Sequence, residues 1–314
     1  MKVLVTGAVG FIGTNLCERL LQEGHEVIGL DDLSGLYKKS NYDDNIKILT
    51  DHPKGTFVQG SILDTDKVFS LKGKSITHVV HLAAKAGVRD SVENPKIYLE
   101  TNLIGTQNIL ELVAQEKISS IVLASSSSVY GSNKTPFVES MSLSTPLNPY
   151  AASKIGMEAL AYSYHHVHKL PITLLRFFTV YGPRGRTDMA AYIFCKAIND
   201  GKKITIHGDG SQKRDFTFVN DIVDGILESM KLNSGFNVFN LGRSDPVILN
   251  DMIGLMEKNL GKTAQKEFID FNFADSKETF ADISKAKKEL NFSPKVSLEE
   301  GIGLFVKWFK DSKQ

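Results

Sequence analysis

The sequence lacks most of what extracellular, membrane-spanning or polyanion-binding proteins depend on. It has two cysteines in 314 residues, too few for a disulfide framework, and the apolar neighbours of Cys17 and Cys195 indicate buried thiols. No apolar run is long enough to cross a bilayer. The first residues lack a basic segment followed by an apolar one, so we expect a cytoplasmic protein.

The sequence also has no excess of charge of either sign. With 37 basic and 36 acidic residues, the formal net charge is +1, so no global field attracts nucleic acid or a membrane, and neither is expected as a partner. The one histidine cluster, at 165, 166 and 168, has no carboxylate pair or cysteine motif beside it. We therefore predict solvated helix histidines and no metal.

Six apolar segments with strand character alternate with helical patterns. They are residues 2–6, 26–31, 56–59, 78–83, 120–125 and 172–177. This alternation predicts an α/β fold with a Rossmann-type, doubly wound parallel sheet covered on both faces, and with ligands at the carboxyl ends of its strands. Beyond Thr179 the rhythm changes to glycine-containing loops and shorter elements. We predict a Rossmann domain over 1–177 and a smaller C-terminal α/β lobe over 178–314 with short returns to the first, and a surface loop over 35–45.

The first predicted strand leads into three glycines, Gly7-x-x-Gly10-x-x-Gly13, followed by a helical pattern. Such glycines allow a tight turn and close approach of a pyrophosphate to the N–H groups that begin the helix. Asp31 ends the second strand, where a carboxylate accepts ribose hydroxyls and repels a 2′-phosphate. The cofactor predicted is NAD rather than NADP, although the nearby Lys38 and Lys39 weigh against this choice.

The pattern Tyr-x-x-x-Lys occurs three times, and context separates the three copies. Tyr130 runs directly into a turn, and Tyr192 lies in an amphipathic run typical of a core or groove aromatic. Tyr150 and Lys154 instead begin a helical stretch, one turn apart on one face, after the four hydroxyls Ser125–Ser128 that close an apolar strand. Because a free phenol titrates near pH ~10, a neighbouring cation is needed for it to act as a base, and Lys154 supplies one.

Several motifs together resemble one known family over nearly the whole chain. They are Thr6-Gly7-x-x-Gly10-Phe11-Ile12-Gly13, His81-Leu82-Ala83-Ala84, Ser125 to Gly131, Tyr150-x-x-x-Lys154 and Arg214-Asp215-Phe216. The chain resembles the extended short-chain dehydrogenases/reductases, in their nucleotide-sugar epimerase branch. Residues 86–89 and 176–190 resemble UDP-glucuronate 4-epimerases, whereas UDP-glucose 4-epimerases place Asn where Thr179 stands.

The resemblance implies a reaction in which Ser126, Tyr150 and Lys154 are the catalytic residues. Tyr150 would take the proton of the C4 hydroxyl as the C4 hydride passes to NAD, Ser126 would bond the same oxygen, and Lys154 would hold the nicotinamide ribose. Return of the hydride to the other face of the 4-keto sugar would invert C4 and regenerate NAD. By the same resemblance the cofactor would be bound by Gly7, Gly10, Phe11, Ile12, Gly13, Asp31, Ser61, Ile62, Leu82 and Lys154.

The resemblance also implies a substrate site. The sugar carboxylate would be held by Ser127, Ser128, Thr179 and Arg186, which would keep a β-keto acid from losing carbon dioxide. The UDP group would lie against Arg89, Arg214 and Asp275. Other interpretations remain open: the serines can stabilise a turn, and Arg89, Arg186 and Arg214 can be surface charges. Ser61 departs from the Asp that relatives usually carry.

Alternative functions also remain open. One is 4-epimerisation of a neutral UDP-sugar, UDP-glucose or UDP-N-acetylglucosamine, and another is a regulator that binds NAD without chemistry. Dehydration is disfavoured because serines stand where dehydratases carry an acid, but decarboxylation as a side reaction is not excluded. The resemblance further implies a homodimer formed by the Tyr150 helix and a helix over about 95–115.

Overall fold

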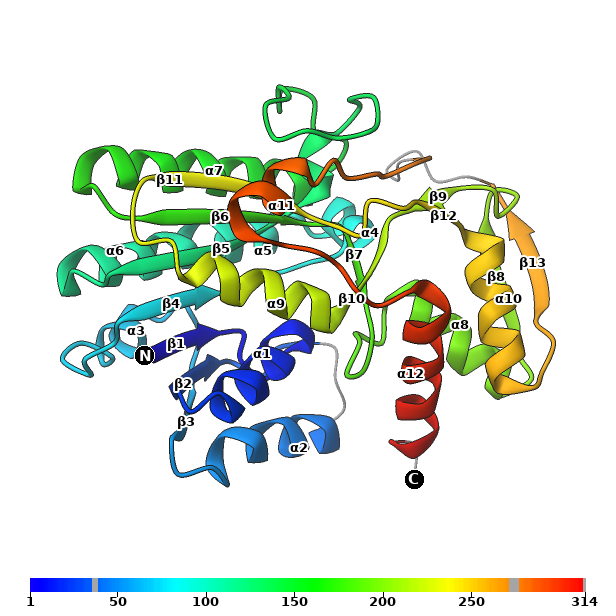
Figure 1. Cartoon of the computed structure of the whole chain (residues 1–314), viewed down its shortest axis with the longest axis horizontal. Coiled ribbons are helices and arrows are strands. Elements are labelled where there is room, and N and C mark those ends of the chain that lie inside the picture. Colours follow the sequence, from blue (N-terminus) through cyan, green and yellow to red (C-terminus); the bar gives the residue numbers. More distant parts are fainter. Residues whose placement is uncertain (36–38, 271–276, 313–314) are drawn as a thin grey trace.

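The centre of the computed structural model, which describes residues 1–35, 39–270 and 277–312, is one parallel sheet (Figure 1). Seven strands follow the order β11-β6-β5-β4-β1-β2-β3. They are β1 (Lys2–Thr6), β2 (Glu26–Asp31), β3 (Gly55–Gln59), β4 (His78–His81), β5 (Ser120–Ser126), β6 (Ile172–Phe177) and β11 (Phe236–Leu241). The predicted fold class is confirmed, and all six predicted strands are present. β11, which pairs with β6, was not predicted.

The order of the strands reverses at β1, which pairs with β2 on one side and with β4 on the other. At such a point the loops after neighbouring strands diverge and leave a crevice at the carboxyl ends. Side chains alternate across the sheet, so that Val3 and Val5 enter one core and Leu4 the other. Both faces are therefore buried, as expected for a doubly wound sheet.

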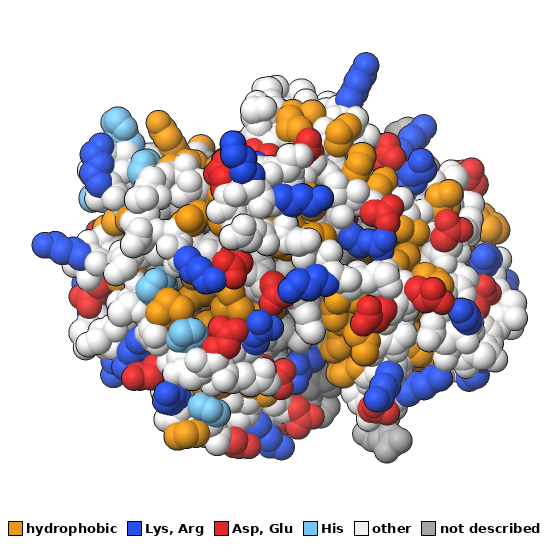
Figure 2. All heavy atoms as spheres, viewed as in Figure 1, with side chains coloured by type: hydrophobic (Ala, Val, Ile, Leu, Met, Phe, Trp, Pro, Cys, Tyr) orange, Lys and Arg blue, Asp and Glu red, His pale blue; other side chains and the backbone are white. Residues whose placement is uncertain are grey.

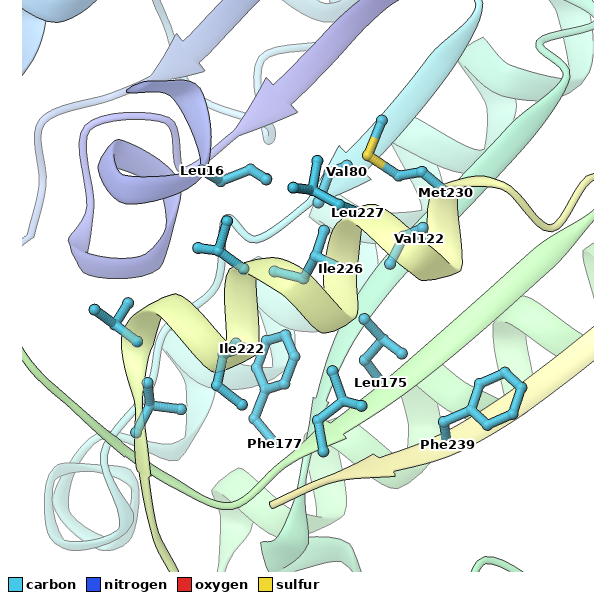
Figure 3. Close-up of a cluster of buried hydrophobic side chains, with 14 of the residues drawn as sticks. Leu16, Val80, Val122, Leu175, Phe177, Ile222, Ile226, Leu227, Met230 and Phe239 are labelled. Atoms are coloured by element: carbon cyan, nitrogen blue, oxygen red, sulfur yellow. The ribbon is translucent and has the colours of Figure 1, made fainter. Parts of the chain in front are cut away.

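Four helices cover the face toward which Val3 and Val5 point. They are α1 (Phe11–Gln22), α2 (Lys39–Thr50), α9 (Val219–Met230) and α11 (Ser284–Leu290). Figure 3 shows Ile222 of α9 beside Phe177 of β6, within the apolar cluster that α9 shares with the sheet. The surface loop predicted over 35–45 is wrong in its second half, because α2 begins at Lys39 and packs against β3.

A second set of helices lies on the other side of the sheet. They are α3 (Thr65–Phe69), α4 (Val88–Glu93), α5 (Pro95–Leu99), the π-helical segment η1 (Glu100–Gly105), α6 (Thr106–Glu116) and α7 (Pro149–His168). The predicted helix over 95–115 is thus helical throughout but contains a π-helical turn. α7 packs on α5, η1 and α6 and buries Met157 against the sheet.

A second group of elements carries its own core around Phe194, Met252 and Phe305, on the right of Figure 1. Its strands pair as β7 (Thr179–Tyr181) with β10 (Phe216–Phe218), β8 (Lys203–His207) with β13 (Gln265–Ile269), and β9 (Lys213–Arg214) with β12 (Val247–Ile248). Its helices are α8 (Ala190–Asn199), α10 (Leu249–Leu260) and α12 (Leu298–Asp311). Between these elements the chain returns to the large sheet through α9, β11 and α11.

Basic and acidic side chains are interspersed over the surface that Figure 2 shows. This distribution agrees with the near-zero net charge. Among the helices of the described residues, none is both long and apolar enough to cross a membrane.

Candidate active site

A pocket of about 400 Å³ opens where β1, β2, β4 and β5 end. It lies at the reversal of strand order, where a parallel sheet is expected to bind ligands. The pocket brings together twelve of the residues predicted for the site. They are Gly7, Gly10, Phe11, Ile12, Gly13, Asp31, Ile62, Leu82, Ser126, Tyr150, Lys154 and Arg186.

The glycine turn has a backbone that larger residues could not adopt. Gly7 has φ +68°, and a Cβ on Gly13 would stand 2.0 Å from the carbonyl oxygen of Gly7. α1 begins at Phe11, and no side chain caps it. The N–H groups of its first turn are therefore not capped by a side chain, and they lie at the positive end of the helix dipole, beside the pocket. This arrangement suits a pyrophosphate.

Asp31 stands at the end of β2 on the same pocket. Its Oδ2 accepts from the Val9 N–H at 3.2 Å and its Oδ1 accepts from the Leu33 N–H at 2.9 Å. Burial raises the pKa of this carboxyl, and the two backbone donors oppose the rise. The N–H groups fix the carboxylate at a helix start, and its remaining lone pairs suit the two hydroxyls of a ribose, so the residues present fit NAD.

Tyr150 is placed by the start of α7. Pro149 occupies the first turn, and the side chain of Asn148 caps the helix by accepting from the Ala151 N–H at 2.9 Å. Burial raises the pKa of the phenol, whereas a hydrogen bond with Ser126 and the charge of Arg186 lower it. The Tyr150 side chain is half-buried. Its phenol thus has the hydroxyl of Ser126 and the positive charge of Arg186 as its polar neighbours.

Lys154 follows one helical turn later and is 4% exposed. Its Nζ donates to the carbonyl oxygen of Ala124 at 2.7 Å, which ties α7 to the end of β5. Burial lowers the pKa of this ammonium to about 8, and the negative charge of Glu158 opposes the fall. A cation thus lies one turn after Tyr150 on the same face of α7, as the Tyr-x-x-x-Lys spacing predicted.

Arg186 reaches the pocket from the loop between β7 and α8. Its guanidinium donates to both carboxylate oxygens of Asp188, and its Nη2 also donates to the carbonyl oxygen of Ala86 at 2.9 Å. Asp188 belongs to the segment 176–190 that carries the resemblance, but no role was predicted for it. No spacing rule pairs residues i and i+2 in a loop, so nothing in the sequence indicated this contact.

Six predicted residues do not line the pocket, and a seventh lies outside the described residues. Ser61 accepts from the Leu63 N–H at 3.2 Å in the turn after β3. The others lie on elements around the pocket: Ser127 and Ser128 in the 3₁₀ turn η2 (Ser127–Tyr130), Thr179 in β7, Arg89 in α4 and Arg214 in β9, while Asp275 is the residue outside the described part.

Tyr98 is a pocket residue that the sequence did not reveal. It is 3% exposed, lies edge-on to Tyr150 with ring centroids 6.2 Å apart, and donates to the Ala86 carbonyl at 3.4 Å. Burial raises its pKa to about 12. Lys85, Asp90 and Thr101 also line the pocket without having been predicted.

The two other Tyr-x-x-x-Lys copies lie away from this chemistry. η2 ends at Tyr130, whose fully buried hydroxyl donates to Asn240 at 2.5 Å, so Tyr130 and Lys134 do not lie on one helix. Tyr192 packs edge-on against Phe309 in the second core. Cys17 and Cys195 are both buried, as predicted. In the described parts of the chain, no three His, Cys, Asp or Glu side chains gather as a metal site.

Known proteins share this architecture along the whole chain. The chain is 44% identical to a UDP-glucuronate 4-epimerase of Thermodesulfobacterium geofontis, over 98% of this chain and 96% of that one. A crystal structure of UDP-glucuronic acid 4-epimerase from Bacillus cereus, in complex with UDP-glucuronic acid and NAD, is 38% identical with a TM-score of 0.94 and covers 99% of this chain and 100% of that chain.

A UDP-glucose 4-epimerase from Thermotoga maritima, solved with UDP-glucose, is 30% identical with a TM-score of 0.90, and the match covers 100% of both chains. The sequence model of the NAD dependent epimerase/dehydratase family matches residues 3–242. Both the pocket and these likenesses lead to one assignment: the chain belongs to the NAD dependent epimerase/dehydratase family.

Proposed function

We propose that this protein is an NAD-dependent isomerase that inverts C4 of a UDP-sugar, converting UDP-glucuronate to UDP-galacturonate through a transient 4-keto sugar. The observation that carries the proposal is that Ser126, Tyr150 and Lys154 line one pocket with Asp31 and the Gly7 turn. The likeness to the Bacillus cereus epimerase, solved with UDP-glucuronic acid and NAD, supports this substrate and this cofactor.

Proton transfer is the task of Tyr150. Its phenol takes the proton of the C4 hydroxyl, and the bond with Ser126 and the charge of Arg186 lower the pKa of that phenol against burial. The ammonium of Lys154, one turn later on α7, adds a further positive charge on the same helix face. NAD, when bound, supplies the hydride acceptor at C4 and returns the hydride afterwards. Ser126 bonds the reacting oxygen, and Lys154 also holds the nicotinamide ribose.

Residues of the first domain would hold the cofactor. The turn Gly7–Gly13 with Phe11 and Ile12 would take the pyrophosphate, Asp31 would take the adenosine ribose, and Ser61, Ile62 and Leu82 would surround the rest. Ser61 supplies only one hydroxyl where an acid could accept two bonds from adenine, so its part in binding is small.

The sugar carboxylate is held by Arg186, with Ser127, Ser128 and Thr179 supplying hydroxyls. A guanidinium binds a carboxylate through two parallel bonds, which keeps the carboxylate plane fixed relative to the C4 carbonyl and so hinders loss of carbon dioxide. Arg89, Arg214 and Asp275 hold the UDP group.

One experiment decides both the reaction and the sugar. The purified protein with NAD is incubated separately with UDP-glucuronate, UDP-glucose and UDP-N-acetylglucosamine, and proton NMR follows the C4 configuration to equilibrium. We expect epimerisation of UDP-glucuronate at the highest kcat/KM, with little carbon dioxide released. Preference for a neutral sugar contradicts the substrate, and saturable binding of NAD without any change of sugar would favour a dinucleotide-binding regulator.

The proposal extends to assembly, location and domain division. We propose a cytoplasmic homodimer in which α7 and the helices over 95–116 pack against their copies. In support, Ile97, Leu99 and Ile104 are 41%, 43% and 50% exposed beside α7, a large apolar exposure for helices at a surface. Light scattering tests it, and a monomer at working concentration contradicts it. We likewise propose that residues 1–177 bind NAD and 178–314 form the nucleotide-sugar lobe.

A further inference from the structure

A buried ion pair lies directly behind the catalytic pocket. The side chains of Glu158 and Arg176 are 8% and 4% exposed. Arg176 Nε donates to Glu158 Oε1 at 3.0 Å, and Nη2 donates to Oε2 at 2.7 Å, so the pair is two-pronged. Neither residue lines the pocket or touches the proposed substrate. A buried pair of this kind does not stabilise a fold better than apolar residues of the same size, so its presence calls for another reason.

Glu158 also accepts a third bond, from the hydroxyl of Ser125 to Oε1 at 2.5 Å. Ser125 precedes Ser126 at the end of β5, Glu158 lies on α7 one turn beyond Lys154, and Arg176 lies near the end of β6. One carboxylate therefore joins the strand end that carries Ser126, the helix that carries Tyr150 and Lys154, and the strand that leads to Thr179.

Arg176 extends the connection away from the pocket. Its Nη1 donates to the hydroxyl of Tyr130 at 3.0 Å and to the carbonyl of Glu139 at 3.2 Å, and the Tyr130 hydroxyl in turn donates to Asn240. The guanidinium thus also bonds η2 and the loop after it, and Tyr130 carries the connection on to β11. The network therefore ties the end of β5 and α7 to β6, η2 and β11.

We propose that Glu158, paired with Arg176, is a positioning residue of this active site: it fixes Ser126 relative to Tyr150 and provides the negative charge that balances the buried ammonium of Lys154. The inference rests on the proposed function, in which those three residues do the chemistry.

The titratable and charged groups around Lys154 show why the protonation of its ammonium depends on the Glu158–Arg176 pair. His81 from β4 is fully buried, with its pKa lowered to about 3 by burial and by Lys154, so it is neutral. On α7 the neighbours are Tyr150 and Glu158. Arg176 from β6 is a second cation, held by Glu158, and Arg186 from the β7–α8 loop acts on Tyr150.

Glu158 is the neighbour that raises the pKa of Lys154 against burial. Removing its charge leaves the effect of burial unopposed, and Lys154 then loses its proton at lower pH. Removing the charge of Arg176 instead leaves an unpaired carboxylate, and Lys154 keeps its proton to higher pH. The two single changes therefore act on the same ammonium in opposite directions.

The test compares Glu158→Gln, Arg176→Gln and the double variant with the wild type, as NAD-bound protein, through the pH dependence of kcat for epimerisation. We expect the alkaline limb to move down by about one pH unit in Glu158→Gln and up by about one unit in Arg176→Gln, and to lie between these two positions in the double variant. The exposed Glu299→Gln, which removes a surface partner of Lys258, is the matched control and leaves the limb in place.

A purely structural pair gives a different result. It lowers kcat in both single variants without moving the limb, or moves it the same way in both, and either outcome overturns the inference. The double variant, which leaves neither member of the Glu158–Arg176 pair without its partner, keeps the test valid if a single variant does not fold.

A second readout does not depend on turnover. Proteins labelled with [13Cε]lysine report the titration of Lys154 directly, assigned by its loss in Lys154→Met. If the wild type epimerises no sugar, the proposed function fails, and opposite displacements of this titration still support the pairing. Unchanged titration in both single variants defeats it, whatever the activity.

Discussion

Arg186 and Asp188 form a two-pronged ion pair within one loop, with Nε donating to Oδ1 at 3.0 Å and Nη2 to Oδ2 at 2.5 Å. The protein's own carboxylate thus occupies an edge of the guanidinium that we assign to the sugar carboxylate. A uronate must bind the other N–H groups of Arg186 or displace Asp188. A neutral sugar does neither, so this pair is the place where the two substrate classes differ.

Replacing Arg186 with Gln is therefore expected to weaken binding of the acidic sugar selectively. Loss of a charge-assisted bond costs about 2 kcal/mol, or about thirtyfold in Kd. We expect the Kd of UDP-glucuronate for the NAD-bound protein to rise by about that factor, and the Kd of UDP-glucose to change less than about threefold. Isothermal titration calorimetry measures both.

The matched control is Arg184→Gln. Arg184 lies in the same loop but donates to Glu18 of α1, outside the pocket. The substitution Arg184→Gln should leave the ratio of the Kd of UDP-glucuronate to the Kd of UDP-glucose unchanged. If Arg186→Gln weakens both sugars equally, Arg186 does not read the carboxylate.

Asp31→Asn tests the cofactor site. An amide keeps the shape but loses the charge that favours ribose hydroxyls and repels a 2′-phosphate. NAD affinity should fall about tenfold to a hundredfold, and discrimination against NADP should shrink. Fluorescence titration with both dinucleotides measures the change, with the surface substitution Asp200→Asn as control. A variant that keeps the full preference for NAD removes Asp31 from this role.

Local sequence patterns predicted the elements of the first half of the chain. The apolar segments of β1, β2 and β6 are bounded by turns, and the glycines after β1 allow a tight turn that larger residues could not adopt. The strands and the dinucleotide-binding turn could therefore be predicted from the sequence. β11 did not, because its burial comes from pairing with β6 more than sixty residues earlier. A pairing at that separation leaves no local periodicity to detect.

The features of the site also differ in whether local sequence encodes them. Tyr150 and Lys154 are fixed relative to each other by helix geometry, which the sequence encodes locally. The π-helical turn at Asn102 is not local: its Oδ1 accepts from the Lys85 N–H and its Nδ2 donates to the Ser153 hydroxyl, two segments that meet only in the folded protein. The Asp188 contact of Arg186 was unseen for a different reason: the two residues are neighbours in one loop, and no spacing rule pairs residues i and i+2 there.

The proposed dimer face can be disrupted at its exposed side chains. Ile104→Glu, at 50% exposure on η1, would bury a charge between subunits and should shift the dimer toward monomer. Light scattering at several concentrations measures the mass. Phe268→Glu, which changes an equally exposed apolar residue on β13, should leave the mass unaltered. A dimer of undiminished affinity in Ile104→Glu contradicts the proposed face.

Lys154→Met is expected to abolish activity yet stabilise the protein at neutral pH. Burial lowers the pKa of Lys154 from 10.5 to about 8, so the folded protein holds this proton less tightly than the unfolded chain does. Stability therefore rises with pH between about 8 and 10.5, and below 8 the full cost of the buried ammonium, about 3 kcal/mol, is present. Loss of the bond to Ala124 costs about 1 kcal/mol, which leaves a net gain of about 2 kcal/mol for methionine at pH 7.

Urea unfolding at pH 7 and at pH 9.5 measures this gain. Because methionine does not titrate, the advantage of Lys154→Met over the wild type should shrink as pH rises, whereas the exposed substitution Lys196→Met should show no such trend. Comparing the two pH values within each protein cancels any constant contribution from bound NAD. An advantage that is absent at pH 7, or that grows with pH, would mean that Lys154 is not held as a strained buried cation, and that its proton is not available to tune the phenol of Tyr150.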